Sequence, residues 1–137
     1  MGTPLDILFD RFISKVDEDL TGKEDLIIAV MDTAKSKIYK TCKHDLSYKI
    51  FDEILYDGEF DNDLDDDEIE LWALQMLYEW NRREQQRLVK QKESVGTSDF
   101  NRLPNKSEQL KAVNAVMKTI QEDIDKLKDD FNTYKYD

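Results

Sequence analysis

An acidic run that changes without a break into an apolar stretch, residues 57–80, constrains this chain more than any other part of its sequence. Asp65 and Glu68 have the spacing of a capping box, which predicts that a helix starts here. Within that helix Glu68, Gln75 and Glu79 form one narrow polar stripe, and nearly all other side chains are apolar. A helix that is apolar on most sides must be covered by other elements or by other subunits. In so small a chain, this pattern predicts assembly rather than catalysis.

The apolar and aromatic side chains of this helix and of the segment before it are therefore candidates for a subunit interface. The expected interface residues are Trp72, Met76, Trp80, Tyr48, Tyr56 and Phe60.

The hydrophobic periodicity predicts four helices, over residues 5–16, 24–42, 66–93 and 107–131. Two prolines and four glycines in 137 residues agree with long helices and few tight turns. We expect an all-α fold, a small bundle of about four helices in a single domain over residues 1–131. Residues 132–137 would form a C-terminal docking tail, because two alternating tyrosines there have no core to enter, and a frayed chain end is the alternative.

Residues 45–64 fit neither helical nor strand periodicity and are treated as an excursion from the helical core. A short hairpin, a helical turn and an extended arm all remain open for this segment. The last predicted helix has a clear heptad pattern, with apolar residues in alternating steps of three and four from Leu110 to Phe131.

Catalysis finds little support. The single histidine, His44, lies two residues from the single cysteine, Cys42, and side chains two apart on a helix point in different directions. Neither a phosphate-binding loop nor paired His and Cys metal spacing is present. We expect Cys42 to be a small core residue, His44 a cation at a helix end, and the protein to have neither enzymatic activity nor a cofactor.

The formal net charge of −11 argues against unspecific binding to nucleic acid or to anionic membranes. A basic stretch nevertheless follows Trp80, with five cations between residues 82 and 92. We interpret it as a solvated helix extension with internal ion pairs, and contact with DNA or with an acidic patch on a neighbouring copy is the alternative.

The acidic run also approximates a twelve-residue calcium loop that begins at Asp57. Its candidate ligands are Asp57, Glu59, Asp61, Asp65 and Glu68. The sixth position, where glycine is usual, is Asn62, and the third is the longer Glu59. Helix capping and loop solvation explain the same acids and are the favoured interpretation.

Several segments together resemble the head–tail connector, or adaptor, proteins of tailed phages that infect Gram-positive bacteria. They are the CKHDLS stretch from Cys42, LDDDEIELWALQMLYEW at 64–80, the SDF element at 98–100 and the aromatic C-terminus. The resemblance spans roughly residues 26–137, and it departs from the family pattern at NRREQQR, residues 81–87.

This resemblance implies a structural virion protein in the neck, made in the host bacterial cytoplasm. It would be one subunit of a ring, typically of twelve copies, between the portal protein and a tail or stopper protein. DNA would pass through the ring without specific binding, and no membrane would be involved. The resemblance also implies that the C-terminal segment reaches the portal, with Phe131, Tyr134, Tyr136 and Asp137 as the expected contacts.

Two alternatives belong to other classes. One is a calcium-binding helical module that uses residues 57–68. The other is an interaction protein that forms a homodimer through the apolar seam from Leu110 to Phe131.

Overall fold

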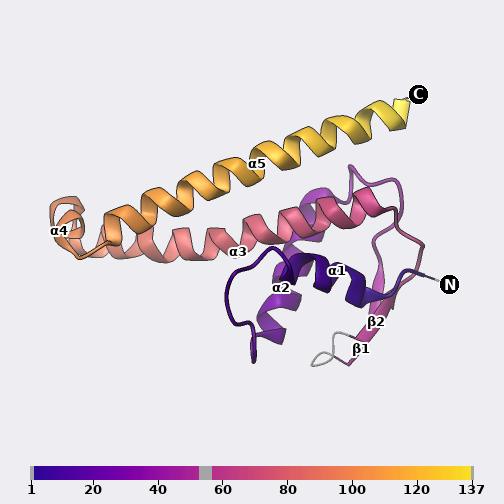
Figure 1. Ribbon diagram of the computed structural model, residues 1–137, viewed down its shortest axis with the longest axis horizontal. Helices are drawn as coiled ribbons and strands as arrows, with labels where there is room; N and C mark the ends of the chain where they lie inside the picture. The colour runs from indigo at the N-terminus through magenta and orange to yellow at the C-terminus, as the bar shows by residue number, and fades with distance from the viewer. Residues whose placement is uncertain (1, 53–56, 137) are drawn as a thin grey trace.

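The computed structural model describes residues 2–52 and 57–136, and side chains as far as Phe131. Two short helices, α1 (Leu5–Ile13) and α2 (Glu24–Ile38), precede a hairpin of β1 (Tyr48–Asp52) and β2 (Asp57–Phe60). The long helix α3 (Asp66–Val95), the short α4 (Thr97–Arg102) and the long α5 (Lys106–Tyr136) follow. Figure 1 shows α3 and α5 as two long rods, with α1, α2 and the hairpin gathered beside the first half of α3.

The predicted start of α3 is confirmed. The Asp65 side chain accepts a hydrogen bond from the backbone of Glu68, and the Glu68 carboxylate accepts one from the Asp65 N–H at 3.0 Å. This reciprocal capping box satisfies two backbone donors that the helix itself leaves without partners. At the other end Gly96, at φ 86°, stops α3 in a conformation that glycine adopts most readily.

The excursion at 45–64 contains an antiparallel hairpin, one of the three conformations left open by the sequence. Tyr48 pairs with Phe60 and Ile50 with Gly58, and β2 buries alternate residues. The expectation of an all-α bundle of four helices is therefore wrong, since the chain is mostly helical with five helices and this sheet in the described residues. A side chain at Gly58 would place its Cβ 2.2 Å from the Lys49 carbonyl oxygen, so glycine alone fits the pairing.

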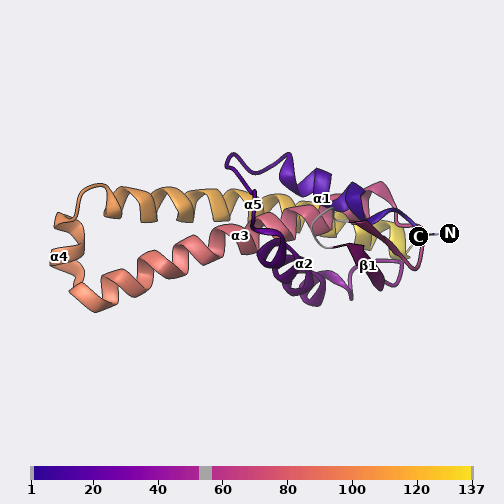
Figure 2. The same ribbon diagram turned by 90° about the horizontal axis from the view of Figure 1, so that it is seen from below.

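The apolar residues form two cores. The larger one joins α1, α2, the hairpin, α3 as far as Trp80 and α5 from Ile120 onward. The smaller core consists of Leu88, Phe100, Val113 and Met117, with Leu103 and Leu110 beside it. We call residues 82–118, which hold the smaller core, the arm, and the rest of the chain the body. In both Figure 1 and Figure 2 the arm projects away from the body, with α4 at its tip.

The last helix is longer than the sequence indicated. α5 continues to Tyr136, whereas the heptad pattern predicted its end at Phe131 with a separate tail after it. Residues 132–136 therefore extend a helix, and Asp137 lies outside the described residues.

Candidate interaction surfaces

The side chains expected at a subunit interface are mostly in the chain's own core. Trp72, Met76 and Phe60 are fully buried, and Trp80 is 8% exposed. The Trp72 indole N–H donates to the Met31 carbonyl oxygen at 3.1 Å, and the Phe60 ring lies 5.2 Å from the Trp72 ring. The hairpin and neighbouring helices of the same chain cover Trp72, Met76 and Phe60 completely, which leaves these three no surface for another subunit, whereas Trp80 keeps a small exposed part.

The other two expected interface residues are on the hairpin segment. Tyr48 is half-buried, and its hydroxyl donates to the Asp32 carboxylate. Burial, followed by that hydrogen bond, raises the pKa of the Tyr48 phenol. Tyr56 lies outside the described residues.

The apolar seam of α5 is also used within the chain. Ile120, Ile124 and Phe131 belong to the core of the body, and Val113 and Met117 to that of the arm. Each of these five side chains is at most 9% exposed. A homodimer through this seam would have to separate α5 from the rest of its own chain. The same burial places Phe131 in the core of the body, where it anchors α5.

The predicted calcium ligands are not brought to one point. Asp57 and Glu59 are exposed on β2, Asp61 is exposed in the turn after it, and only Asp65 and Glu68 lie together at the cap of α3. Within the described part of the chain, the one group with metal-ligating proximity is His44, Asp65 and Glu68, whose ligand atoms lie within 4.8 Å of one another.

Both oxygens of the Glu68 carboxylate already have hydrogen-bonding partners. One oxygen accepts the His44 backbone N–H at 3.0 Å, and the other accepts the Asp65 N–H and lies 2.6 Å from His44 Nδ1. Glu68 is completely buried, and such a carboxylate is stable only with partners of this kind. The cluster thus fastens the loop before β1 to the start of α3. The expectation that His44 caps carbonyls at a helix end is wrong, and no local signal connects it with a partner 24 residues away.

Cys42 is a core residue, as predicted, at 9% exposure. Burial, followed by the nearby Glu68 carboxylate, raises the pKa of its thiol to about 12. Since the thiolate is the reactive form, we expect a thiol reagent at pH 8 to label the folded protein about 100-fold more slowly than the urea-unfolded protein. Labelling followed by absorbance checks this, and equal rates in the two states would contradict the burial.

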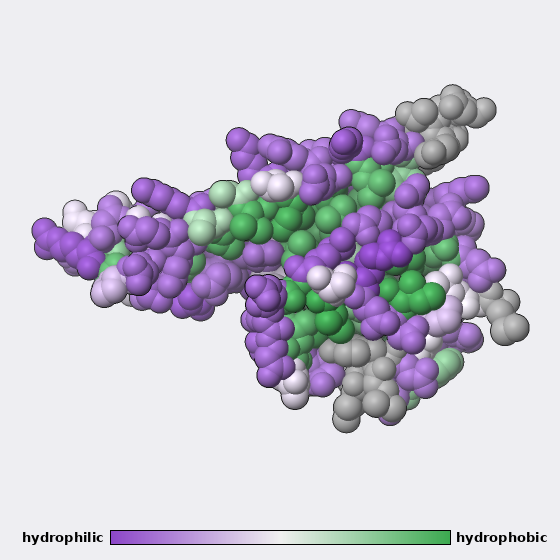
Figure 3. All heavy atoms as spheres, in the orientation of Figure 1, coloured by the Kyte–Doolittle hydropathy of each residue, from purple (hydrophilic) through white to green (hydrophobic). Residues whose placement is uncertain are grey.

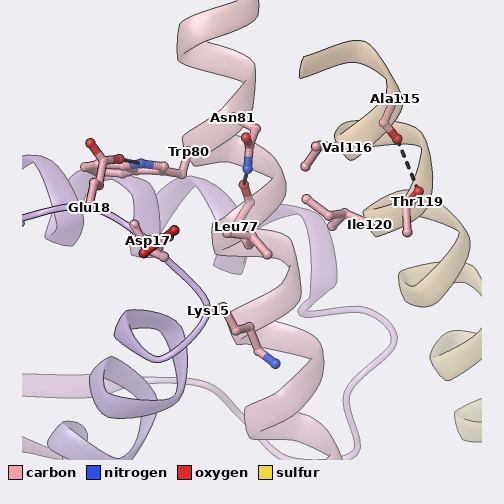
Figure 4. Close-up of a pocket in the computed structure, with 11 residues that line it drawn as sticks. Lys15, Asp17, Glu18, Leu77, Trp80, Asn81, Ala115, Val116, Thr119 and Ile120 are labelled. Atoms are coloured by element: carbon pink, nitrogen blue, oxygen red, sulfur yellow. Dashed lines mark hydrogen bonds between the residues drawn. The ribbon is translucent and has the colours of Figure 1, made fainter. Parts of the chain in front are cut away.

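An open groove of about 670 Å³ lies where the arm leaves the body. Figure 4 shows its three sides, with the loop after α1 on one side, α3 as the floor and α5 opposite. The lining residues are Lys15, Val16, Asp17, Glu18, Leu77, Trp80, Asn81, Ala115, Val116, Thr119 and Ile120. Val116 is 46% exposed in this groove. Figure 3 shows apolar atoms gathered between α5 and the body, bordered by hydrophilic residues.

Charge is divided between the two parts of the molecule. The arm carries nine Lys and Arg against four Asp and Glu, a net charge of +5. The remaining residues carry eleven cations against 27 acids, a net charge of −16. The basic stretch after Trp80 does extend α3 as predicted, and Arg87 pairs with Glu84 within it. The sequence alone did not indicate that this basic stretch belongs to a projecting arm.

Comparison of the chain with protein-family models, with curated proteins and with solved structures finds no match. None of the helices that the structure describes combines the length and the apolar character needed to cross a bilayer.

Proposed function

We propose that this chain is a structural subunit that assembles head to tail, as a connector in the neck of a tailed phage virion. The observation that carries the proposal is the separation of charge along the molecule, with a basic arm at one end and an acidic body at the other. A molecule with unlike ends favours heterologous contacts, in which one end of a copy meets the other end of the next. Such contacts form a ring when their rotation closes.

The charge also suits a passage for DNA. In a head-to-tail ring each basic arm would be covered by the acidic body of a neighbour. The exposed surface would then keep the negative sign of the whole chain, which has a net charge of −11. A negative lumen repels phosphate groups, so DNA passes without being held.

The rest of the proposal follows from the sequence resemblance to head–tail connectors. The partners would be the portal protein and a tail or stopper protein. The portal contact would involve Tyr134 and Tyr136 in the last turn of α5 and Asp137 after it in the sequence, with Phe131 holding the neighbouring part of the helix to the body. The protein would be made in the host bacterial cytoplasm and would act without enzymatic activity or cofactor.

The test is electron microscopy of complexes recovered with the tagged protein from a lysate of its native source. We expect rings, or capsid vertices that carry the protein, and their symmetry would give the copy number. An untagged lysate taken through the same purification is the control. Recovery of the protein as a lone small particle, without capsid or portal material, would overturn the proposal.

A further inference from the structure

The groove at the base of the arm has an apolar floor and a free acidic group at its edge. Glu18 is engaged, because its carboxylate accepts the Trp80 indole N–H, and Lys15 pairs with Glu70 at 2.7 Å. Asp17 has no hydrogen-bond or ion-pair partner among the residues that the structure describes. Across the groove, on α5, Val116 is 46% exposed. The groove therefore presents an apolar surface and an unpaired carboxylate.

One face of the arm has the complementary character. Gln86 follows Arg82 by four residues, and Val89 and Lys90 follow Gln86 by three and four, so the four side chains lie on one face of α3. All four are exposed, and Val89 is 37% exposed. Neither Arg82 nor Lys90 has a carboxylate at ion-pair distance in the described part of the chain. This face therefore presents an apolar side chain between two unpaired cations.

The arm of the same chain cannot fill the groove. Trp80 in the groove and Val89 on the arm belong to one uninterrupted helix of 30 residues, which rises about 1.5 Å per residue. Val89 is thus held roughly 13 Å along the helix axis from Trp80. Only a second molecule can place this arm face against the groove.

We propose that the groove receives the Arg82–Lys90 face of the arm of a second copy. Val89 of that copy would lie on Val116 and Leu77, and its cations would approach Asp17. The contact is heterologous, because the arm of each copy is used by one neighbour and its groove by the other. The inference rests on the proposed function for the expectation that copies assemble.

The groove is small compared with the interface of a stable protein complex. Its eleven lining residues are fewer than the 20–30 residues per side that are usual in stable complexes. A single contact of this kind is expected to be weak, and closing a ring adds the effective concentration that makes it persist. The test should therefore capture weak contacts.

Disulfide trapping between two differently tagged proteins meets this requirement. One protein carries Val89→Cys and the other Val116→Cys, so a disulfide between the two tags joins different molecules. The matched control replaces the first protein with Phe51→Cys, because Phe51 is 62% exposed on the hairpin and lies in neither surface. The native Cys42 is buried and does not compete. Circular dichroism checks that each variant is folded.

We expect the Val89–Val116 pair to give at least about fivefold more disulfide between the two tags than the control pair, since bridging needs Cα atoms within about 7 Å. Added to the trapping pair, Asp17→Arg in the Val116→Cys protein should lower the yield about fivefold, and so should Arg82→Asp in the Val89→Cys protein. The two changes together should restore the yield, because they exchange the charges of one contact. A yield equal to that of the control would overturn the inference.

Failure of this inference is distinguishable from failure of the proposed function. Virion rings recovered from the native source, together with a trapping yield no higher than that of the control pair, would refute the docking and leave the connector intact. Specific trapping by a protein that never associates with capsid material would establish the docking and refute the connector.

Discussion

Replacement of Trp72 with alanine is expected to lower the free energy of unfolding by about 4 kcal/mol, in the range for a large buried aromatic residue. The side chain is fully buried, and its ring contacts Phe60 at 5.2 Å and Tyr48 at 6.3 Å between centroids. Alanine would leave a cavity between α3 and the hairpin and would remove the donor to the Met31 carbonyl. Urea unfolding followed by far-ultraviolet circular dichroism measures the loss.

The matched control is Phe51→Ala. This aromatic residue is 62% exposed on β1, so its removal should change the free energy of unfolding by less than about 0.5 kcal/mol. The pair of variants also tests whether Trp72 contacts another subunit. If Trp72→Ala dissociated an assembly while the stability of the isolated chain stayed unchanged, Trp72 would be an interface residue after all.

Helical structure was largely predictable because its signals are local. The Asp65–Glu68 spacing marks the first turn of α3, and the heptad pattern from Leu110 marks α5. The hairpin was not assigned because its two strands have only five and four described residues, and their pairing joins positions such as Tyr48 and Phe60. A period of two cannot be established over so few residues.

The interaction surfaces were harder to predict, for a different reason. Periodicity shows which side of a helix is apolar, and does not show whether the same chain or another copy covers it. Trp72 and Met76 are covered by their own chain, whereas Val89 and Val116 are exposed, and no sequence pattern distinguishes these two valines from core residues. The sequence of residues 82–92 shows that this part of the chain is basic. Its separation from the acidic body follows from the fold, because the α3 residues of the larger core extend only as far as Trp80.

Replacement of Glu68 with alanine is expected to cost about 3 kcal/mol of the free energy of unfolding. The change would leave the partly buried backbone N–H groups of His44 and Asp65 without their acceptor. Each loss is expected to cost about 1 kcal/mol, at the lower end of the range for buried donors without a partner. Loss of the capping box adds to this at the start of α3. The loop before β1 would also lose the hydrogen bonds between His44 and Glu68 that hold it to α3. Amide hydrogen exchange at His44 should therefore accelerate more than exchange in the middle of α5.

Two further variants, Glu68→Gln and Glu122→Ala, are the controls for the loss of stability expected in Glu68→Ala. Glutamine keeps one acceptor oxygen and should cost less than alanine, whereas Glu122 is exposed on α5 and its removal should be close to neutral. Unchanged exchange at His44 in Glu68→Ala would show that the carboxylate does not hold the loop. A calcium-dependent change in tryptophan fluorescence that Glu68→Gln abolished would instead make this carboxylate a metal ligand. Because both of its oxygens already accept protein hydrogen bonds, we expect calcium to leave the fluorescence of the native chain unchanged.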